Sequence, residues 1–341
     1  MAFNPSYSQR LRANRMVRVI VVLLVLSAIV VSLQTSYYSQ QIVLPAGQGK
    51  GGPSKTFVVA SLEKEDISWL HRYLPEWDIS RYVADDPSAN LTVPKNKGQE
   101  AMTYLTYMID SYDNLPDLMV FMHNGRYQWH NDDPLYDAVP VLQNLQLPYL
   151  ISQQYTNLRC VWTLGCPAEM EFNKSPEDVD ASKTTEKAYP KAFGELFPGQ
   201  SVPPAVGVAC CAQFAVTREK IRERPVEDYK RYRQWLLDTP LDDYVSGRIL
   251  EYSWHIIFGK PPVHCPDTKE CYCRVFGQCG LECDGGECGN HWPFPPFSTL
   301  PLGWPTVGWD GEMRSEEVLA GLRGNATSIS PATEIRSKGS V

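Results

Sequence analysis

The stretch DLMVFMH, residues 117–123, decides how the rest of the chain is interpreted. It is a continuous apolar run of strand length, and such runs are typical of strands that are buried on both faces of a parallel sheet. A polar segment, NGRYQWHNDDPLYD, follows it directly. Ligands bind beyond the carboxyl ends of the strands in open α/β sheets, so the run predicts a central strand and the place of a site.

The segments around this run predict an α/β fold. Apolar residues recur at helical spacing between residues 101 and 112, and Pro116 ends that helix. We therefore expect an α/β domain over residues 56–262, with a mostly parallel central sheet and flanking helices. The other expected elements are strands at residues 56–62, 80–86 and 206–216, and one helix over residues 246–260.

The N-terminal segment predicts a membrane anchor. Residues 16–35 contain the uncharged run VIVVLLVLSAIVVSL, and arginines but no acidic residues precede it. This charge pattern predicts a cytoplasmic tail at residues 1–15 and a body that is lumenal (ER or Golgi) or extracellular. A cleaved signal peptide is the alternative, because the run is short for a membrane span. Residues 36–55 read as a flexible stem.

The cysteines predict disulfide bonds, because their number is even and the expected compartment is oxidising. Zinc binding is the alternative, but the spacing matches no pair of C-x-x-C motifs. Cys210 and Cys211 are adjacent, and we expect each to have a distant partner or one to stay reduced. The ten cysteines are Cys160, Cys166, Cys210, Cys211, Cys265, Cys271, Cys273, Cys279, Cys283 and Cys288.

The C-terminal part carries most of these cysteines. Residues 263–300 read as a Cys-rich extension that disulfides hold to the main domain, because the segment is too poor in apolar runs to form its own core. Residues 301–341 read as a mostly disordered tail. Asn90 and Asn325 stand in glycosylation sequons, which agrees with a secretory route.

Charge and missing motifs exclude several functions. The net charge of −7 argues against a general nucleic-acid binder. The chain contains no Walker loop, no G-x-S-x-G and no H-E-x-x-H motif, which removes the commonest nucleotidase, lipase and zinc-protease interpretations.

The polar segment after residue 123 is the first candidate site. Its side chains could line a substrate site, with Asp132 in a catalytic role and Asp85 and Asp86, which end the strand at residues 80–86, as ligands of Mg²⁺ or Mn²⁺. Alternatively, the acidic residues cap a turn before Pro134 and the histidines are ordinary loop residues. The candidate substrate-binding residues here are His123, Asn124, Trp129, His130, Asn131 and Asp133.

The helix expected at residues 246–260 is the second candidate. Arg248, Glu251 and His255 form one polar stripe, and Trp254 lies beside Glu251. A partly desolvated Glu251 would have a raised pKa and would suit a general base, with His255 assisting and with Arg248 and Trp254 at the substrate. The alternative is an ordinary ion pair between Glu251 and Arg248.

The turn PKNKGQE, residues 94–100, is the third candidate. A glycine turn that leads into a helix can bind an anion through free backbone N–H groups, and Asn96, Lys97 and Glu100 would then contact the substrate. A simple capping turn with Glu100 in the first helical turn explains the pattern equally well.

Six blocks, in order, carry a resemblance to a known family. They are VVASLEKEDISWL, VPKNKGQEAMTYLTYMIDSYDNLPD, FMHNGRYQWHNDDP, NLRCVWTLGCP, CCAQFAVTREKIRERP and GRILEYSWHIIFG, and they span about residues 55–290. Together they resemble a group of fungal membrane-anchored proteins known as domain of unknown function 3431. The order of elements is also similar to that of GT-A type nucleotide-sugar transferases. In place of the usual Asp-x-Asp after a central strand, this chain has His123-Asn124-Gly125.

The second resemblance implies a function. The chain is expected to transfer a sugar from a nucleotide-sugar donor to a glycan, protein or lipid acceptor, with Mn²⁺ or Mg²⁺ as the implied cofactor and the lipid bilayer as a partner of the anchor. A non-catalytic lumenal carbohydrate-binding or structural protein is the alternative. A third interpretation is an oxidase or hydrolase that uses His123 and His130 with a transition metal.

Overall fold

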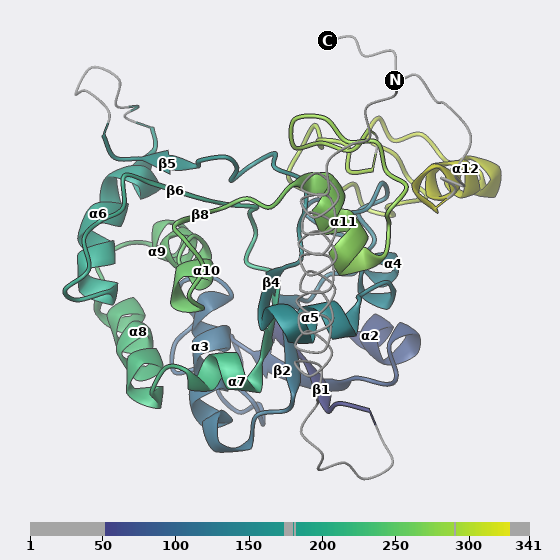
Figure 1. The fold of residues 1–341 in the computed structure, drawn as a ribbon. Coiled ribbons are helices and arrows are strands. Elements are labelled where there is room, and N and C mark those ends of the chain that lie inside the picture. The colour runs from purple at the N-terminus through teal and green to yellow at the C-terminus, as the bar shows by residue number, and fades with distance from the viewer. Residues whose placement is uncertain (1–51, 174–179, 181, 290, 328–341) are drawn as a thin grey trace, which may run out of the picture. The chain divides into compact units, whose positions relative to one another are not determined.

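The structure is a computed structural model, and it describes residues 52–173, 180, 182–289 and 291–327 (Figure 1). The chain divides into two units, Met1–Gly52 and Pro53–Val341, and the description below concerns the second. The anchor expected at residues 16–35 lies outside the described residues. No helix in the described part is long and apolar enough to cross a membrane.

The central sheet has five strands in the order β2-β1-β3-β7-β4. They are β1 (Lys55–Ser61), β2 (Asp78–Val83), β3 (Leu118–His123), β4 (Tyr155–Asn157) and β7 (Phe214–Thr217). The apolar run at residues 117–123 therefore forms the middle strand, as predicted.

The expectation of a mostly parallel sheet is wrong. β1 pairs in parallel with β2 and β3, but β7 pairs antiparallel with both β3 and β4. An antiparallel strand needs no long crossover connection, and nothing in its apolar pattern distinguishes it from a buried parallel strand. The chain is thus a mixed α/β protein, in which the start of β7 lies beside the end of β3.

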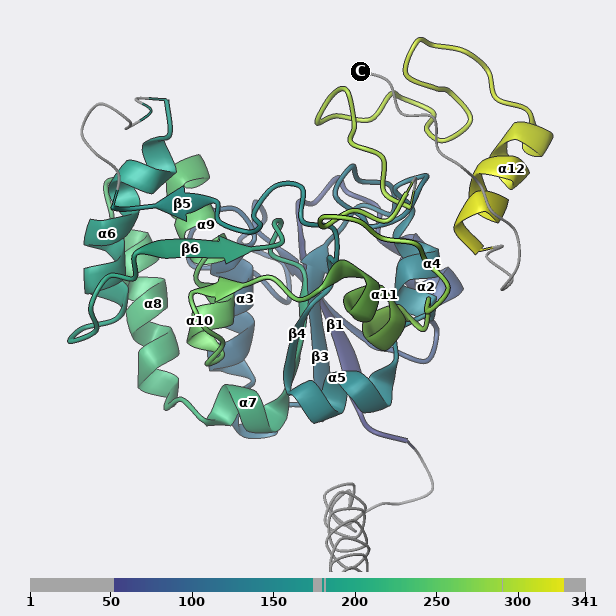
Figure 2. The ribbon, with the colours of Figure 1, turned by 45° about the horizontal axis from the view of Figure 1, so that its top comes forward.

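Two layers of helices cover the sheet, and Figure 2 shows the strands between them. Alternate residues of β3 supply the two cores: Met119 and Phe121 face one layer, and Leu118, Val120 and Met122 face the other. This alternation explains why every residue from 118 to 122 is apolar. The first layer comprises α3 (Ala101–Asp110), α6 (Thr184–Leu196), α8 (Val226–Asp238), α9 (Asp243–Glu251) and α10 (Trp254–Ile257).

The opposite layer contains the disulfide-linked extension. Cys271 on α11 bonds to Cys160, which follows β4, and the helix packs its apolar face against the sheet. The extension thus completes the core, because it covers sheet surface that the other helices leave open. This layer comprises α2 (Ser68–Tyr73), α4 (Ala138–Gln143), α5 (Leu147–Gln153) and α11 (Thr268–Phe276).

Residues 206–216 form two strands instead of the single strand predicted. β6 (Ala205–Val208) belongs to a small sheet with β5 (Met170–Glu171) and β8 (Val263–His264), whereas β7 belongs to the central sheet. The chain turns between them, and that turn carries the adjacent cysteines. Continuous hydrophobicity predicted burial correctly, but it could not reveal where the chain changes sheets.

The helix expected at residues 246–260 is also interrupted. α9 ends at Glu251, Tyr252 and Ser253 lie outside the helices, and α10 starts at Trp254. Ser253 donates from its hydroxyl to the Ile249 carbonyl at 2.7 Å. Side-chain bonding of this kind competes with continuation of a helix, and the break turns His255 away from the face that carries Glu251.

All ten cysteines are paired, as the disulfide prediction required. The bonds are Cys160–Cys271, Cys166–Cys265, Cys210–Cys211, Cys273–Cys279 and Cys283–Cys288. The expectation that Cys210 and Cys211 have separate partners is wrong. The turn between β6 and β7 holds both sulfurs on the same side of the chain, where they bond to each other.

The remaining elements lie at the edges of the domain. The short helices η1 (Tyr112–Asn114) and α7 (Arg218–Arg222) connect layers, and α12 (Glu316–Thr327) is the last element. We expected residues 301–341 to be mostly disordered, and the structure describes a helix over part of that range. Of the two sequon asparagines, Asn90 is exposed and Asn325 lies within α12.

Candidate functional site

The candidate site lies where β3 and β4 end and β7 begins. His123 is the last residue of β3, Arg159 follows β4 by two residues, and Cys211 precedes β7 by three. His123 falls on the same face of the sheet as Phe121, since side chains alternate along a strand. It therefore faces the layer that contains α9.

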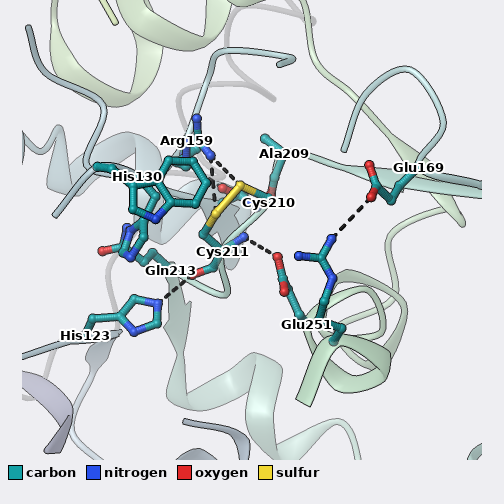
Figure 3. The surroundings of a disulfide bond; sticks show 12 residues. His123, His130, Arg159, Glu169, Ala209, Cys210, Cys211, Gln213 and Glu251 are labelled. Carbon is teal, nitrogen blue, oxygen red and sulfur yellow. Dashed lines mark hydrogen bonds and ion pairs between the residues drawn. A yellow bond between two sulfur atoms is a disulfide. The ribbon is translucent and has the colours of Figure 1, made fainter. Parts of the chain in front are cut away.

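The turn that carries Cys210 and Cys211 is the centre of the site (Figure 3). Cys211 has a φ of 86° and Ala212 has a φ of 49°, both in the left-handed region that residues with a β-carbon rarely adopt. Such conformations cost free energy and collect at functional sites, so these two residues point to a function for the turn.

Neighbouring side chains hold this turn in place. The Cys211 N–H donates to Glu251 Oε1 at 2.5 Å, and His123 Nε2 donates to the Cys211 carbonyl at 2.9 Å. The Asn157 amide donates to the Ala209 carbonyl at 2.7 Å. Cys211 thus joins α9 to β3 through its own backbone.

A glycine contact brings a second carboxylate next to Glu251. A β-carbon at Gly247, on α9, would lie 2.8 Å from Gln99 Cγ and 3.1 Å from the Gly98 carbonyl oxygen. Only glycine lets the helix approach the turn before α3 so closely. Glu100 caps α3 immediately after this turn, so its carboxylate lies in the electrostatic range of Glu251 and Arg248.

Both carboxyl groups hold a proton more strongly than usual. Burial raises the pKa of Glu100 to about 7, although Arg248 opposes the shift. Burial also raises the pKa of Glu251; Arg248 opposes this shift and the charge of Glu100 adds to it. Carboxyl groups with raised pKa values can exchange protons with a bound molecule, as general acid–base catalysis requires.

Arg248 is oriented by a residue from outside its helix. Its Nη2 lies 3.2 Å from Glu169 Oε1 and 3.3 Å from the Tyr252 hydroxyl. The ion pair that the structure gives Arg248 is therefore with Glu169, and the simple Arg248–Glu251 pair considered from the sequence is not formed within the described residues. Among the described residues, the hydrogen bond of the Glu251 carboxylate is the one that Oε1 accepts from the Cys211 N–H.

His123 and His130 form a neutral pair. Their ring centroids lie 4.5 Å apart. Burial lowers the pKa of His123, and burial together with the charge of His123 lowers the pKa of His130 well below its usual range. The Gln213 amide donates to His130 Nδ1 at 3.0 Å, so the proton of this ring sits on Nε2.

Arg159 is buried in the middle of these groups. Its side chain is only 2% exposed, and its guanidinium carbon lies 4.5 Å from the Trp292 ring centroid. Nη1 donates to the sulfurs of Cys210 and Cys211. Nε and Nη2 have no hydrogen-bond partner among the described residues.

Two clefts open near the site. One, of about 170 Å³, is bordered by Glu169, Arg248 and Tyr252, and reaches the α9 side. The other, of about 350 Å³, is bordered by Tyr127, Trp129 and His130 on one wall and by residues 298–300 on the other. Glu251 lines neither cleft, although its helix neighbours border the first.

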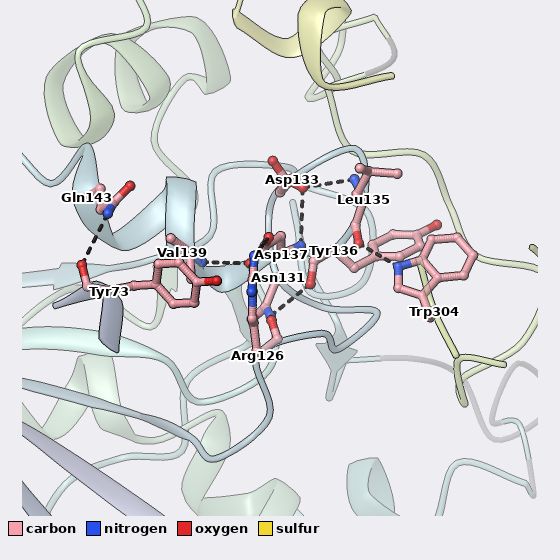
Figure 4. Close-up of polar contacts among 10 residues, drawn as sticks. All are labelled: Tyr73, Arg126, Asn131, Asp133, Leu135, Tyr136, Asp137, Val139, Gln143 and Trp304. Atoms are coloured by element: carbon pink, nitrogen blue, oxygen red, sulfur yellow. Dashed lines mark hydrogen bonds and ion pairs between the residues drawn. The ribbon is translucent and has the colours of Figure 1, made fainter. Parts of the chain in front are cut away.

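Most acidic residues of the polar loop have a structural role (Figure 4). Asp133 accepts from the N–H groups of Leu135 and Asp137 at 2.8 and 3.1 Å. The Asn131 amide donates to the carbonyls of Arg126 and Tyr136 at 2.9 and 3.0 Å. These bonds match the turn-capping alternative that the sequence left open.

Asp132 is likewise occupied. It is 3% exposed, and it accepts from the Cys160 N–H at 2.8 Å and from the Tyr272 hydroxyl at 2.5 Å. It therefore clamps α11 to the segment after β4, beside the disulfide between them. We assign Asp132 a structural role in place of the catalytic role expected for it.

Two residues expected beside Glu251 lie elsewhere. His255 is fully buried, and its Nε2 donates to the Pro262 carbonyl at 2.9 Å. Burial lowers its pKa to about 4, so it is neutral. Trp254 is 1% exposed and packs on Tyr104, Phe214 and Phe258 as part of the core.

The other expected contacts are dispersed. Lys97 is buried and donates to the Thr239 carbonyl, whereas Asn96 is exposed on the same turn. The Asn124 carbonyl accepts from Trp69 Nε1 at 2.8 Å. Trp129 lies beside Arg159, with its ring centroid 5.9 Å from the guanidinium carbon.

The residues present do not fit a hard divalent ion. Asp85 accepts from the Glu63 N–H at 2.8 Å, and Asp86 accepts from the Ser88 N–H and hydroxyl at 2.8 and 2.7 Å. Among the described residues, the group with ligand spacing is Cys210, Cys211 and Glu251. Its sulfurs are engaged in a disulfide, which leaves a single carboxylate as an oxygen ligand.

Sequence reasoning missed three components of the site. Arg159 was overlooked because a lone arginine in NLRCVWTLGCP resembles a surface residue. The Cys210–Cys211 bond was rejected on the usual geometry of disulfides. The pairing of Glu100 with Glu251 depends on a glycine contact between segments about 150 residues apart, though the two glycines Gly98 and Gly247 were a visible signal.

Fold and site together define a mixed α/β protein in which two carboxyl groups with raised pKa values lie near the ends of the central strands. The chain belongs to the family described as protein of unknown function DUF3431, which it matches over residues 57–274. The family resemblance drawn from the sequence is thereby confirmed. No curated protein and no solved structure is similar to the chain.

Proposed function

We propose that this chain is a glycosyltransferase, which moves a sugar from a nucleotide-sugar donor to a hydroxyl group of a glycan, protein or lipid. The observation that carries the proposal is the position of Glu251. It is a carboxylate with a raised pKa, next to a second carboxylate and a buried arginine, at the edge where ligands bind in open α/β sheets.

The proposed step is a single displacement at the sugar. Glu251 accepts the proton of the acceptor hydroxyl as its oxygen forms a bond to the anomeric carbon. The bond between that carbon and the donor phosphate breaks, and the nucleoside diphosphate leaves with the electron pair. Glu100 tunes Glu251 through its charge, and the Cys211 N–H orients the Glu251 carboxylate.

The two clefts suit the two substrates. The cleft with Tyr127 and Trp129 offers aromatic faces on which a base or a sugar can stack, and it adjoins the residues around Arg159. The cleft with Arg248 and Tyr252 adjoins Glu251 from the other side and would receive the acceptor. The GT-A-like character expected from the sequence remains part of this proposal.

A purely carbohydrate-binding role would not require the titratable groups that surround Cys211. A binding surface needs aromatic faces and hydrogen-bond partners, and the second cleft supplies these. It gains nothing from two neighbouring carboxylates that are partly removed from water, which costs stability. This cost favours catalysis over binding alone.

A secretory location belongs to the same proposal. All ten cysteines, each of them in the described part of the chain, form disulfides, which persist in oxidising compartments. Asn90, in a sequon, is exposed. We propose a single-pass anchor at residues 16–35 with the folded domain in the ER or Golgi lumen or outside the cell.

A thermal-shift screen tests the proposal. The full-length chain, in a mild detergent, is heated with a panel of nucleotide sugars, with the matching free nucleotides and with simple glycans. A ligand that binds the folded state raises the melting temperature. We expect a shift with one class of nucleotide sugar. Shifts with glycans alone would replace the proposal by the carbohydrate-binding alternative.

A further inference from the structure

Arg159 is the one group in the site whose burial the fold itself does not explain. A guanidinium has five N–H donors and its charge is costly to bury without partners. No carboxylate among the described residues lies within ion-pair distance of Arg159, although the charges of Asp132 and Glu251 act on it from further away. Its Nε and Nη2 are buried and unpartnered.

The surroundings hold the arginine rigidly in this state. Nη1 donates to the Cys210–Cys211 disulfide, and the rings of Trp292 and Trp129 lie 4.5 and 5.9 Å from the guanidinium carbon. Trp292 is fixed in turn, because its Nε1 donates to the Trp129 carbonyl at 2.9 Å. Nη1 is engaged, whereas the N–H groups of Nε and Nη2, which lie side by side, are unpaired. These two groups are pre-organised to receive two oxygens of an anion.

We propose that Arg159 is the binding residue for the diphosphate of the donor, and that it supplies the positive charge for which other transferases use a metal ion. This inference rests on the proposed function. Two observations favour it. Among the described residues, the oxygen ligands needed for a hard divalent ion are not gathered at the site. Arg159 also lies against Trp129, which lines the donor cleft, and it is within electrostatic range of Glu251.

The chemistry of the leaving group agrees with this role. When the bond to the sugar breaks, negative charge grows on the phosphate oxygen that leaves, and a fixed cation in a site of low dielectric constant stabilises that charge. Neutral His123 and His130 do not compete with the arginine for the anion. His130 itself borders the donor cleft, and its Nδ1 is already engaged by the Gln213 amide.

Calorimetric titration with inorganic pyrophosphate in the presence of EDTA tests this inference. The full-length chain should bind pyrophosphate without metal, and R159M should bind it at least about tenfold more weakly because charge-assisted hydrogen bonds are lost. R159K keeps the positive charge but loses the planar pair of N–H donors. Its affinity for pyrophosphate should lie between those of the wild type and R159M. R231M is the matched control, since Arg231 also lies over a ring, that of Tyr232, but pairs with Asp228 on α8.

A measurement on the unaltered protein covers the case in which R159M does not fold. Pyrophosphate should change the tryptophan emission, because Trp292 contacts the guanidinium. No emission change and no binding heat in the wild type would overturn the inference, as would equal affinities in the wild type and R159M. A response to malonate but none to pyrophosphate would overturn it too, because the site would then recognise carboxylates.

The test separates this inference from the proposed function. E227Q, which changes an exposed side chain on α8 outside the site, should bind pyrophosphate as the wild type does. Binding that depends on Arg159, in a protein that turns over no nucleotide sugar, would support the anion site and contradict the transferase. Turnover with an unchanged KM in R159M would contradict the anion site alone.

Discussion

Glu100 lowers the stability of the folded protein at neutral and high pH. Its carboxyl group is shielded from water and has a pKa near 7 in the folded chain, against 4.5 when exposed. Between these two values the folded state holds more protons than the unfolded state. The free energy of unfolding therefore falls as pH rises through this window, and it stays reduced above pH 7.

The variant E100Q should consequently stabilise the protein at high pH. We expect a gain on the order of 2 kcal/mol at pH 8 and almost none at pH 4, measured by urea unfolding at both values. E227Q on α8, where the side chain is exposed, is the control and should change little at either pH. An equal effect of E100Q at pH 4 and pH 8 would show that the carboxylate is not desolvated in the fold.

At the scale of single residues, the sequence identifies side-chain types but not their partners. It showed that residues 123–133 are rich in acid–base groups, yet the structure engages Asn131, Asp132 and Asp133 in holding backbone. Glu251 was identified because burial was expected to raise its pKa, and burial does raise that pKa in the structure. Trp254, which was expected to cause this burial, lies in the core instead. The sequence could not identify Arg159 as a site residue, because only the folded chain shows that its Nε and Nη2 are buried without a partner.

At the scale of elements, the contact between α9 and the turn before α3 determines the distance between the two carboxylates. G247A adds a β-carbon that meets the Gly98 carbonyl oxygen at 3.1 Å and Gln99 Cγ at 2.8 Å. We expect it to destabilise the protein by about 1–3 kcal/mol, because the two elements must move apart. It should also lower the transfer rate, since Glu100 moves with the turn.

G194A on α6 is the matched control, because a β-carbon there meets nothing within 4 Å. This change should stabilise the protein by about 0.5–1 kcal/mol, as alanine favours a helix more than glycine does. Thermal unfolding and the transfer rate are measured for both variants. If G247A behaved like G194A in both measurements, the close approach of α9 to the turn would have no importance for the site.

Some local sequence patterns were sufficient to predict the bounds of a strand or helix, and others were not. Continuous apolar runs predicted β1 and β3 correctly, and helical spacing predicted α3 to within two residues. Residues 206–216 and 246–260 were each predicted as one element and are each divided. In both cases the interruption depends on a turn or a side-chain bond, and the apolar pattern runs through it unchanged.

At the scale of the whole molecule, two long-range disulfides hold the Cys-rich extension on the sheet. The Cys160–Cys271 bond closes a loop of 111 residues, whereas Cys283–Cys288 closes one of 5. Loop-closure entropy predicts a stabilisation of about 5 kcal/mol for the first bond and about 2 kcal/mol for the second. The double variants C160A/C271A and C283A/C288A should therefore differ clearly in melting temperature.

The first double variant should also impair the site, because α11 contacts Asp132 and thereby the segment that leads to Arg159. Differential scanning calorimetry of both variants checks the order of stabilities. Equal losses would mean that the extension contributes little beyond its own local folding.

The sequence was sufficient to predict the α/β class of the fold. It was not sufficient to predict the direction of each strand in the central sheet. Burial of both sheet faces follows from apolar runs, which is why the α/β class is confirmed. Strand direction depends on how the chain returns to the sheet, and the chain returns in β7, antiparallel to β3, after it has formed β5 and β6 of the small sheet. The candidate site was placed at the strand ends from the sequence, but its members come from segments that only this topology brings together.

The most direct test of the account is a transfer assay on the full-length chain with the donor found in the ligand screen. Release of the nucleoside diphosphate and formation of the glycosylated acceptor are measured together for the wild type, E251Q and the control E227Q. We expect both products from the wild type and E227Q, and a fall of about 10²- to 10⁴-fold in E251Q, the usual contribution of a general base. Turnover by E251Q at the wild-type rate, with a donor that the protein binds, would contradict the assignment of this site.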